Sequence, residues 1–148
     1  MSQTLIQIAD AVAAELNSPA FQPRIAEAFR AERVYLPDFE LQDLKQLKVV
    51  VIAAASPQQE FATREMNQAE YGIEIGIQKK VSSTSPEELD PLLAFAGEIG
   101  SFLRRRELAA FPEAVPIRLQ NDPAYEADLL YERRQFASVI EITYQVLE

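Results

Sequence analysis

The sequence predicts an α+β domain, in which a mainly antiparallel sheet of about five strands carries two principal helices on one face, in the order α-β-β-β-α-β-β. Two segments with alternating apolar and polar residues, 70–81 and 136–146, predict long half-buried strands. Two segments with apolar residues at helical spacing, 5–16 and 85–103, predict the helices that cover those strands. The chain of 148 residues is long enough for one core of its own, so we expect a single domain over residues 1–148.

The segment 70–81 organises this prediction, because successive side chains of a strand point to opposite faces. One face is apolar and consists of Tyr71, Ile73, Ile75, Ile77 and Val81. The other face consists of Gly72, Glu74, Gly76, Gln78 and Lys80. The last strand repeats the pattern, with Phe136, Ile140, Ile142, Tyr144 and Val146 on one face. We therefore expect these two strands to pair.

Local patterns predict the elements that precede this strand. The first helix carries Leu5, Ile8, Ala9, Val12 and Leu16, and Asn17-Ser18-Pro19 ends it. Segment 21–37 has both helix-like and strand-like spacing; we expect a strand from about Phe29 to Leu36, ended by Pro37. The β-branched run Lys48 to Ala54 predicts a central strand with both faces covered.

The polar stretch 56–68 is the expected connection to the organising strand, and a long hairpin there would project beyond the sheet. Arg64 and Glu65 lie in it. Solvated side chains are one interpretation of this pair, and contact with a partner is the other.

The second helix has the clearest local signal in the sequence. Ser85 at the N-cap, Pro86 at the first helical position and Glu88 at the third predict a capping box with a pre-set first turn. Gly97 and Gly100 interrupt the helix, each lowering helix propensity by about 1 kcal/mol relative to Ala, and would allow close approach to the sheet or to a neighbouring subunit. Arg104, Arg105 and Arg106 are expected in the last turn. They favour interaction with the negative helix end, or alternatively form a partner-facing patch.

The C-terminal part predicts two more strands with an acidic loop between them. Val115 to Gln120 is expected near a sheet edge, because Pro116 cannot donate to a ladder. In the loop that follows, Asp122, Glu126 and Asp128 are candidate ligands for a hard cation, but their spacing matches no full calcium loop. We expect no metal and no cofactor.

The composition restricts the chemistry. The chain has no His and, across its whole length, no Cys, so His-based acid–base chemistry, thiol nucleophiles and the usual zinc ligands are excluded. No phosphate-binding, zinc-protease or serine-hydrolase motif occurs. Carboxylate pairs such as Glu70 with Glu74, or Asp122 with Asp128, are the remaining candidates for glycosidase-type chemistry. A net charge of −9 argues against tight binding to DNA or to anionic membranes, and a non-enzymatic role is favoured.

The order of these elements resembles small tail proteins of long-tailed phages and prophages. The resemblance runs through LQDLKQLKVVVI, YGIEIGIQKKV, PEELDPLLAFAGEIGSFL and IRLQNDPAYEADLLYERRQFASVIEITYQV, and covers most of the chain from about Arg33 onward. It is most similar to the tail terminator family, also called tail completion or head–tail joining proteins. It is a resemblance of element order and contains no diagnostic motif, so it transfers no individual functional residue.

Membership of that family would imply a structural protein that assembles into a hexameric ring at the head-proximal end of the tail tube. Its partners would be copies of itself, the tail tube protein and the capsid connector or neck protein, with DNA only passing through the lumen and no membrane involved. Its location would be the virion tail, and the host cytoplasm during assembly. The residues themselves, and not the family, name Arg64, Glu65, Arg104, Arg105 and Arg106 as candidate subunit or partner contacts. The loops name Glu40, Asp43 and Glu60 as candidate acids for the lumen.

Three alternatives remain open from the sequence. The chain could be another phage neck or minor tail component of similar fold. It could instead be a small-ligand or enzyme domain that uses carboxylates, in which case two close acids should share a concave pocket. A monomeric adaptor that binds an acidic partner through residues 104–106 is the third.

Overall fold

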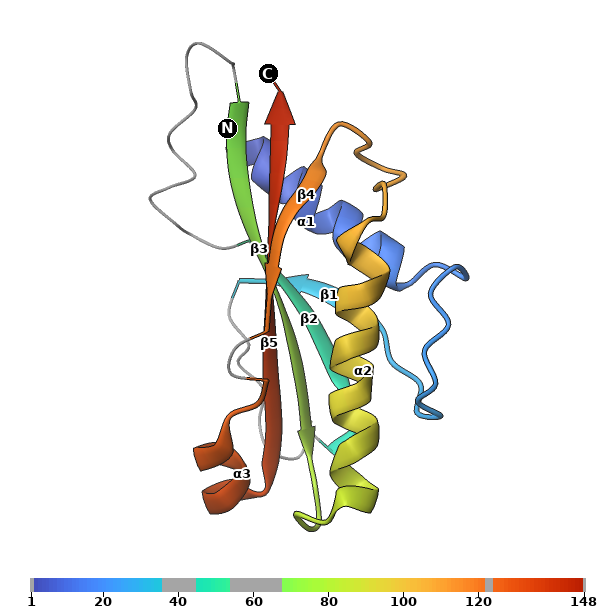
Figure 1. The fold of residues 1–148 in the computed structure, drawn as a ribbon, viewed down its shortest axis with the longest axis vertical. Coiled ribbons are helices and arrows are strands. Elements are labelled where there is room, and N and C mark those ends of the chain that lie inside the picture. Colours follow the sequence, from blue (N-terminus) through green and yellow to red (C-terminus); the bar gives the residue numbers. More distant parts are fainter. Residues whose placement is uncertain (1, 36–44, 54–67, 122–123, 148) are drawn as a thin grey trace.

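The computed structural model describes residues 2–35, 45–53, 68–121 and 124–147 (Figure 1). In chain order the elements are α1 (Ser2–Leu16), β1 (Ala31–Val34), β2 (Lys48–Ala53), β3 (Gln68–Lys80), α2 (Pro86–Arg104), β4 (Val115–Gln120), α3 (Ala127–Arg133) and β5 (Gln135–Leu147). The α+β class with a five-stranded sheet is confirmed. The two principal helices lie where the sequence predicted them.

The sheet has the strand order β1-β2-β3-β5-β4. The organising strand β3 and the final strand β5 pair antiparallel over their full length, from Gln68 opposite Leu147 to Lys80 opposite Gln135, as expected. β2 pairs antiparallel with β3, and β4 with β5. β1 pairs parallel with β2, so the sheet is mixed although mainly antiparallel. Local patterning predicts that a strand forms, but its direction is decided by how the chain returns to the sheet.

The register of β3 against β5 assigns the residues of these two strands to two faces. On the core face, Ile73 lies opposite Ile142 and Ile75 opposite Ile140, and all four are buried. On the other face, Glu74 lies opposite Glu141 and Gly76 opposite Val139. We call it the helix-free face, because in the described part of the chain the long helices α1 and α2 both pack on the core face. The alternating pattern of both strands is therefore confirmed.

Both faces of β2 are covered, as predicted for a central strand. Val49 and Val51 point into the core, and Val50 on the helix-free face is only 1% exposed. Gly76 lies beside Val50, and a Cβ at Gly76 would come within 3.0 Å of the Val50 Cγ2. A glycine here thus leaves room for the neighbouring valine.

The two long helices share the core face. α1 contacts β1, β2 and β3, whereas α2 contacts β4 and β5. In Figure 1, α1 passes behind the strands and α2 runs along their right-hand side. α2 buries Leu92, Phe95, Ala96, Ile99, Gly100 and Leu103. Of the two helix glycines, Gly100 faces the sheet, where its Cβ would be 3.4 Å from the Leu119 side chain of β4.

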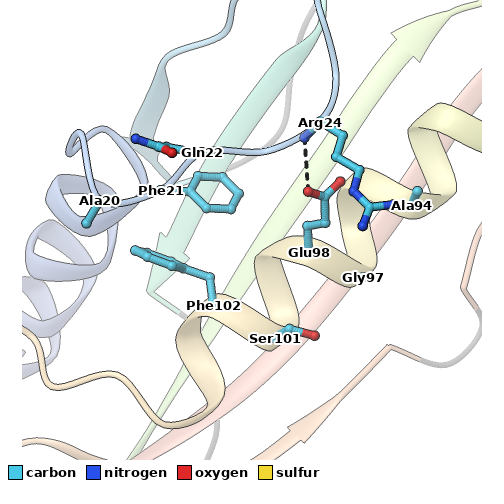
Figure 2. A pocket seen from close by; sticks show the side chains of 9 residues that line it. All are labelled: Ala20, Phe21, Gln22, Arg24, Ala94, Gly97, Glu98, Ser101 and Phe102. Carbon is cyan, nitrogen blue, oxygen red and sulfur yellow. Dashed lines mark hydrogen bonds between the residues drawn. The ribbon is translucent and has the colours of Figure 1, made fainter.

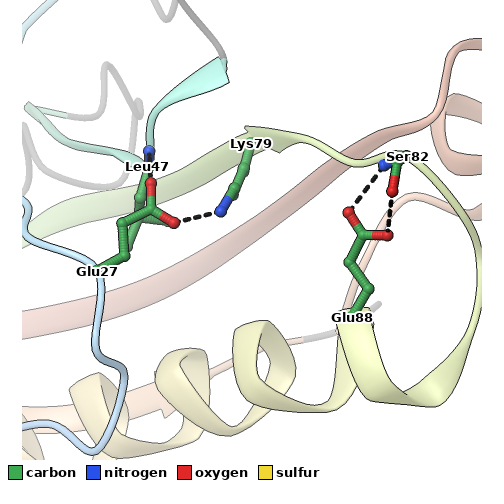
Figure 3. A network of polar contacts seen from close by, with 5 residues as sticks. All are labelled: Glu27, Leu47, Lys79, Ser82 and Glu88. Carbon is green, nitrogen blue, oxygen red and sulfur yellow. Dashed lines mark hydrogen bonds and ion pairs between the residues drawn. The ribbon is translucent and has the colours of Figure 1, made fainter.

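Two details differ from the sequence prediction. Ser85 is the N-cap and Pro86 the first residue of α2, but the Ser85 side chain forms no cap hydrogen bond. Instead, Glu88 accepts a hydrogen bond from the backbone N–H of Ser82 at 2.7 Å (Figure 3). It also accepts one from the backbone N–H of Ser83 at 3.0 Å. The expected capping box is therefore wrong in its partners, because the turn after β3 brings these earlier N–H groups to the carboxylate.

The acidic loop contains a helix that the sequence did not predict. α3 has seven residues, buries Leu130, and ends at Arg134, whose φ of 52° is left-handed. Its apolar residues are too few to establish a helical period in the sequence. The helix packs against β5, and helices this short depend on tertiary packing for their stability. The first strand is also shorter than the expected range of about 29–36.

Candidate functional site

Residues 17–30 form a strap between α1 and β1 that polar contacts attach to the rest of the domain. The Asn17 side chain donates to the Ala31 carbonyl at 2.9 Å and accepts from the Ala31 N–H at 2.8 Å. Further along, the Glu27 carboxylate accepts from the Leu47 N–H at 2.6 Å and pairs with Lys79 of β3 (Figure 3). The strap is thereby fixed at its start and near its end.

Between this strap and α2 lies an open groove of about 570 Å³ (Figure 2). Its apolar wall consists of the Phe21 and Phe102 rings, whose centroids are 4.8 Å apart, together with the small residues Ala20, Ala94 and Gly97. Its polar rim consists of Gln22, Arg24, Glu98 and Ser101. The Glu98 carboxylate accepts from the Arg24 N–H at 3.0 Å and so connects the strap to the helix.

Gly97 faces open space, because an added Cβ there would meet no atom of the described residues within 4 Å. Glycine in an exposed helix interior is less favourable than alanine by about 1 kcal/mol. The two helix glycines therefore differ: Gly100 permits contact with the sheet, whereas Gly97 leaves the groove wide.

A smaller pocket of about 170 Å³ lies where the start of α2 meets the segment before β5. It is lined by Thr84, Pro86, Leu89, Asp90, Leu93, Tyr125, Leu130 and Phe136. Neither pocket holds two carboxylates, since the groove contains Glu98 and the smaller pocket contains Asp90.

The three consecutive arginines have different environments. Arg106 turns inward, pairs with the buried Glu15 of α1, and lies with its guanidinium carbon 4.5 Å from the centroid of the Phe102 ring. Glu15 also accepts from the Ala109 N–H at 2.8 Å. Arg104 ends α2 and Arg105 is its C-cap, and both are exposed. Only Arg104 thus lies within the last helical turn, where all three were expected.

The environment of Glu15 combines opposing influences on its ionisation. Burial raises the pKa of this carboxyl, but hydrogen bonds from Arg106 and the Ala109 N–H, with the positive charge of Arg106, outweigh it and hold the pKa below its usual value. Burial, and then the negative charge of Glu15, raise the pKa of the Tyr144 hydroxyl. Glu15 is therefore a charged residue built into the core.

The helix-free face brings Glu74 and Glu141 together. They lie directly opposite on β3 and β5, and burial followed by repulsion from Glu141 raises the pKa of Glu74. On the same face Glu70 pairs with Arg118 of β4. The sequence named Glu70 with Glu74 as a carboxylate pair, but the register places Glu141 beside Glu74 and gives Glu70 a cation.

The other predicted site residues either lie outside the described residues or are exposed at the surface. Arg64, Glu65, Glu40, Asp43, Glu60 and Asp122 lie outside the described residues. Glu126 and Asp128 are exposed at the start of α3. Among the residues the structure describes, no group of three or more potential ligands is placed to hold a metal ion.

Sequence reasoning missed Glu27, Glu98 and Glu141 as residues with specific roles. The alternating pattern of the last strand places Glu141 on the polar face, but only the β3–β5 register shows what it faces. Glu27 and Glu98 act across long sequence separations, for which no local signal exists.

Comparison with protein-family models gave no match, and neither did comparison with curated proteins. Within the described part of the chain, no helix is both long and apolar enough to cross a membrane. Functional inference therefore depends on the fold and its surfaces.

Proposed function

We propose that this protein is a structural component of a phage or prophage tail, which caps the head-proximal end of the tail tube as a ring and joins it to the capsid connector. The proposal begins from the resemblance in element order to tail terminator proteins. The described elements keep that order, with α3 added before the last strand. In this role the protein acts by shape and by contact with copies of itself, without catalysis.

The observation that carries the proposal is that the two sides of the sheet offer different surfaces. On the helix side, an apolar groove contains Gly97, an exposed glycine at which an added Cβ would meet no atom of the described residues within 4 Å. On the helix-free side, two facing carboxylates lie on the central strands. Head-to-tail assembly into a closed ring requires two different surfaces on each subunit, and the chemical difference between these two surfaces supports the proposal.

The charge balance is consistent with a channel through which DNA passes. Phosphates find few cations to neutralise them on a chain of net charge −9, so DNA would move past without being held. The carboxylate-enzyme alternative has less support, because Glu74 and Glu141 lie on a sheet face and in neither of the two pockets described above.

The test is the mass of the purified protein in solution, measured by light scattering over a range of concentrations, with electron micrographs of negatively stained particles. We expect a hexameric ring, or self-association toward one, and rings bound to the ends of tubes when tail tube protein is added. Binding to the connector but never to the tube would indicate another neck component. A strict monomer that never joins tubes would refute the proposal.

A further inference from the structure

The acids of the helix-free face form an incomplete electrostatic arrangement. Glu74 lies between Ile52 of β2 on one side and Glu141 of β5 on the other. Like charges directly opposite in a sheet are destabilising. Among the described residues neither carboxylate has an ion-pair partner, and the contact to Glu141 is an amide hydrogen bond from Gln120 at 3.5 Å.

The same chain carries two cations that lack an acidic partner among the described residues. Arg104 and Arg105 are exposed at the C-terminal end of α2, and within the described part of the chain they take part in no ion pair. The ion pairs there are Arg33–Asp10, Lys79–Glu27, Arg106–Glu15 and Arg118–Glu70. Arg106, next in sequence, is already used by Glu15.

These acids and cations lie on opposite sides of the sheet. Phe95 and Ile99 of α2 are buried with the core-face residues of β3 and β5, whereas Glu74 and Glu141 alternate to the other face. A single molecule therefore does not bring them together, but two copies can. Such a contact joins different surfaces of the two copies, so it repeats from subunit to subunit and closes into a ring where the rotation allows.

We propose that the helix-free face around Glu74 and Glu141 docks onto the Arg104–Arg105 end of α2 in a second copy of this chain. This inference rests on the proposed ring and names its subunit contact. The guanidinium forks supply paired N–H donors that match carboxylates in geometry as well as charge. Val139, 39% exposed on the same face, adds an apolar contact beside the charges.

The test is a charge reversal with rescue by mixing. One variant carries Arg104→Glu with Arg105→Glu, and a second carries Glu74→Gln with Glu141→Lys. Each alone should lower the self-association constant by about tenfold or more at low salt. Mixed in equal amounts they should recover assembly, because every contact then joins opposite charges and a ring with an even number of subunits can alternate.

A matched control carries Lys45→Glu with Arg133→Glu, which removes two exposed cations elsewhere and changes the net charge as the first variant does. Sedimentation at about 0.05 M and about 0.5 M salt separates specific pairing from general repulsion, and circular dichroism verifies folding of each variant. If the reversals weaken assembly no more than the control does, the contact is refuted while the ring stands. A wild-type protein that stays monomeric overturns both.

A second measurement does not depend on the charged variants, because the chain contains no Cys. Copies carrying Arg104→Cys are mixed with copies carrying Glu141→Cys and oxidised. We expect the mixed disulfide to dominate over both homodimers. Homodimers forming as readily as the mixed species would contradict the proposed contact.

Discussion

The contact between Glu15 and Arg106 provides the sharpest stability prediction. Glu15 keeps 5% of its side chain exposed and Arg106 keeps 35%. Breaking a fully buried ion pair by removing one partner destabilises by about 3–5 kcal/mol. Because water reaches part of Arg106, we expect Arg106→Met to lower the free energy of unfolding by about 2–3 kcal/mol at neutral pH.

The pH dependence of this loss has a definite sign. In the wild type the pKa of Glu15 is lowered, so its stabilising contribution is present above the unfolded-state pKa and is lost as the pH falls through the folded-state pKa. In Arg106→Met the desolvated carboxyl lacks its cation, and burial then raises its pKa. The difference between wild type and variant should therefore shrink on going from pH 7 to about pH 5.

The assay is urea unfolding followed by far-ultraviolet circular dichroism at both pH values. The double variant Glu15→Gln with Arg106→Met removes both charges but keeps an acceptor for the Ala109 N–H, and should return to within about 1 kcal/mol of wild type. A loss below about 0.5 kcal/mol for Arg106→Met, or a loss that does not shrink in acid, would refute the reasoning.

The remaining predictions concern four single substitutions. Gly97→Ala should raise the free energy of unfolding by about 0.5–1 kcal/mol, because its Cβ meets nothing within 4 Å, whereas Gly76→Ala should lower it by crowding Val50; urea melts compare the two. Glu74→Gln should stabilise the neutral-pH protein by about 0.2–1 kcal/mol by removing a facing charge. Since the folded-state pKa of Glu74 is raised, this gain should vanish as the pH falls below the ordinary carboxyl range, and a gain that persists in acid would contradict the assignment. Glu88→Gln should lower the free energy of unfolding by about 1 kcal/mol at neutral pH, because the charged carboxylate accepts hydrogen bonds that a neutral amide holds less strongly. The hydrogen bond from the Ser82 N–H is the largest cause of the lowered pKa of Glu88, so the difference in stability between wild type and variant should disappear in acid, as thermal melts would show.

Much of the fold was determined by local sequence patterns. The alternation through Ile73 and Ile75 determined which side chains of β3 are buried, and the same period in the last strand determined its core face. Ser85 and Pro86 marked the start of α2. These features depend only on the geometry of a single helix or strand, so a short stretch of sequence is enough to predict them.

The tertiary structure decided what depends on residues distant in sequence. It made β1 parallel to β2, stabilised α3 against β5, and gave Glu88 different partners from those expected. It also separated Arg106, which is half-buried and pairs with Glu15, from Arg104 and Arg105, which remain exposed, although the three are consecutive. The sequence shows that a charge is present, but its partner is set by strand register and helix docking, and these depend on the whole core at once.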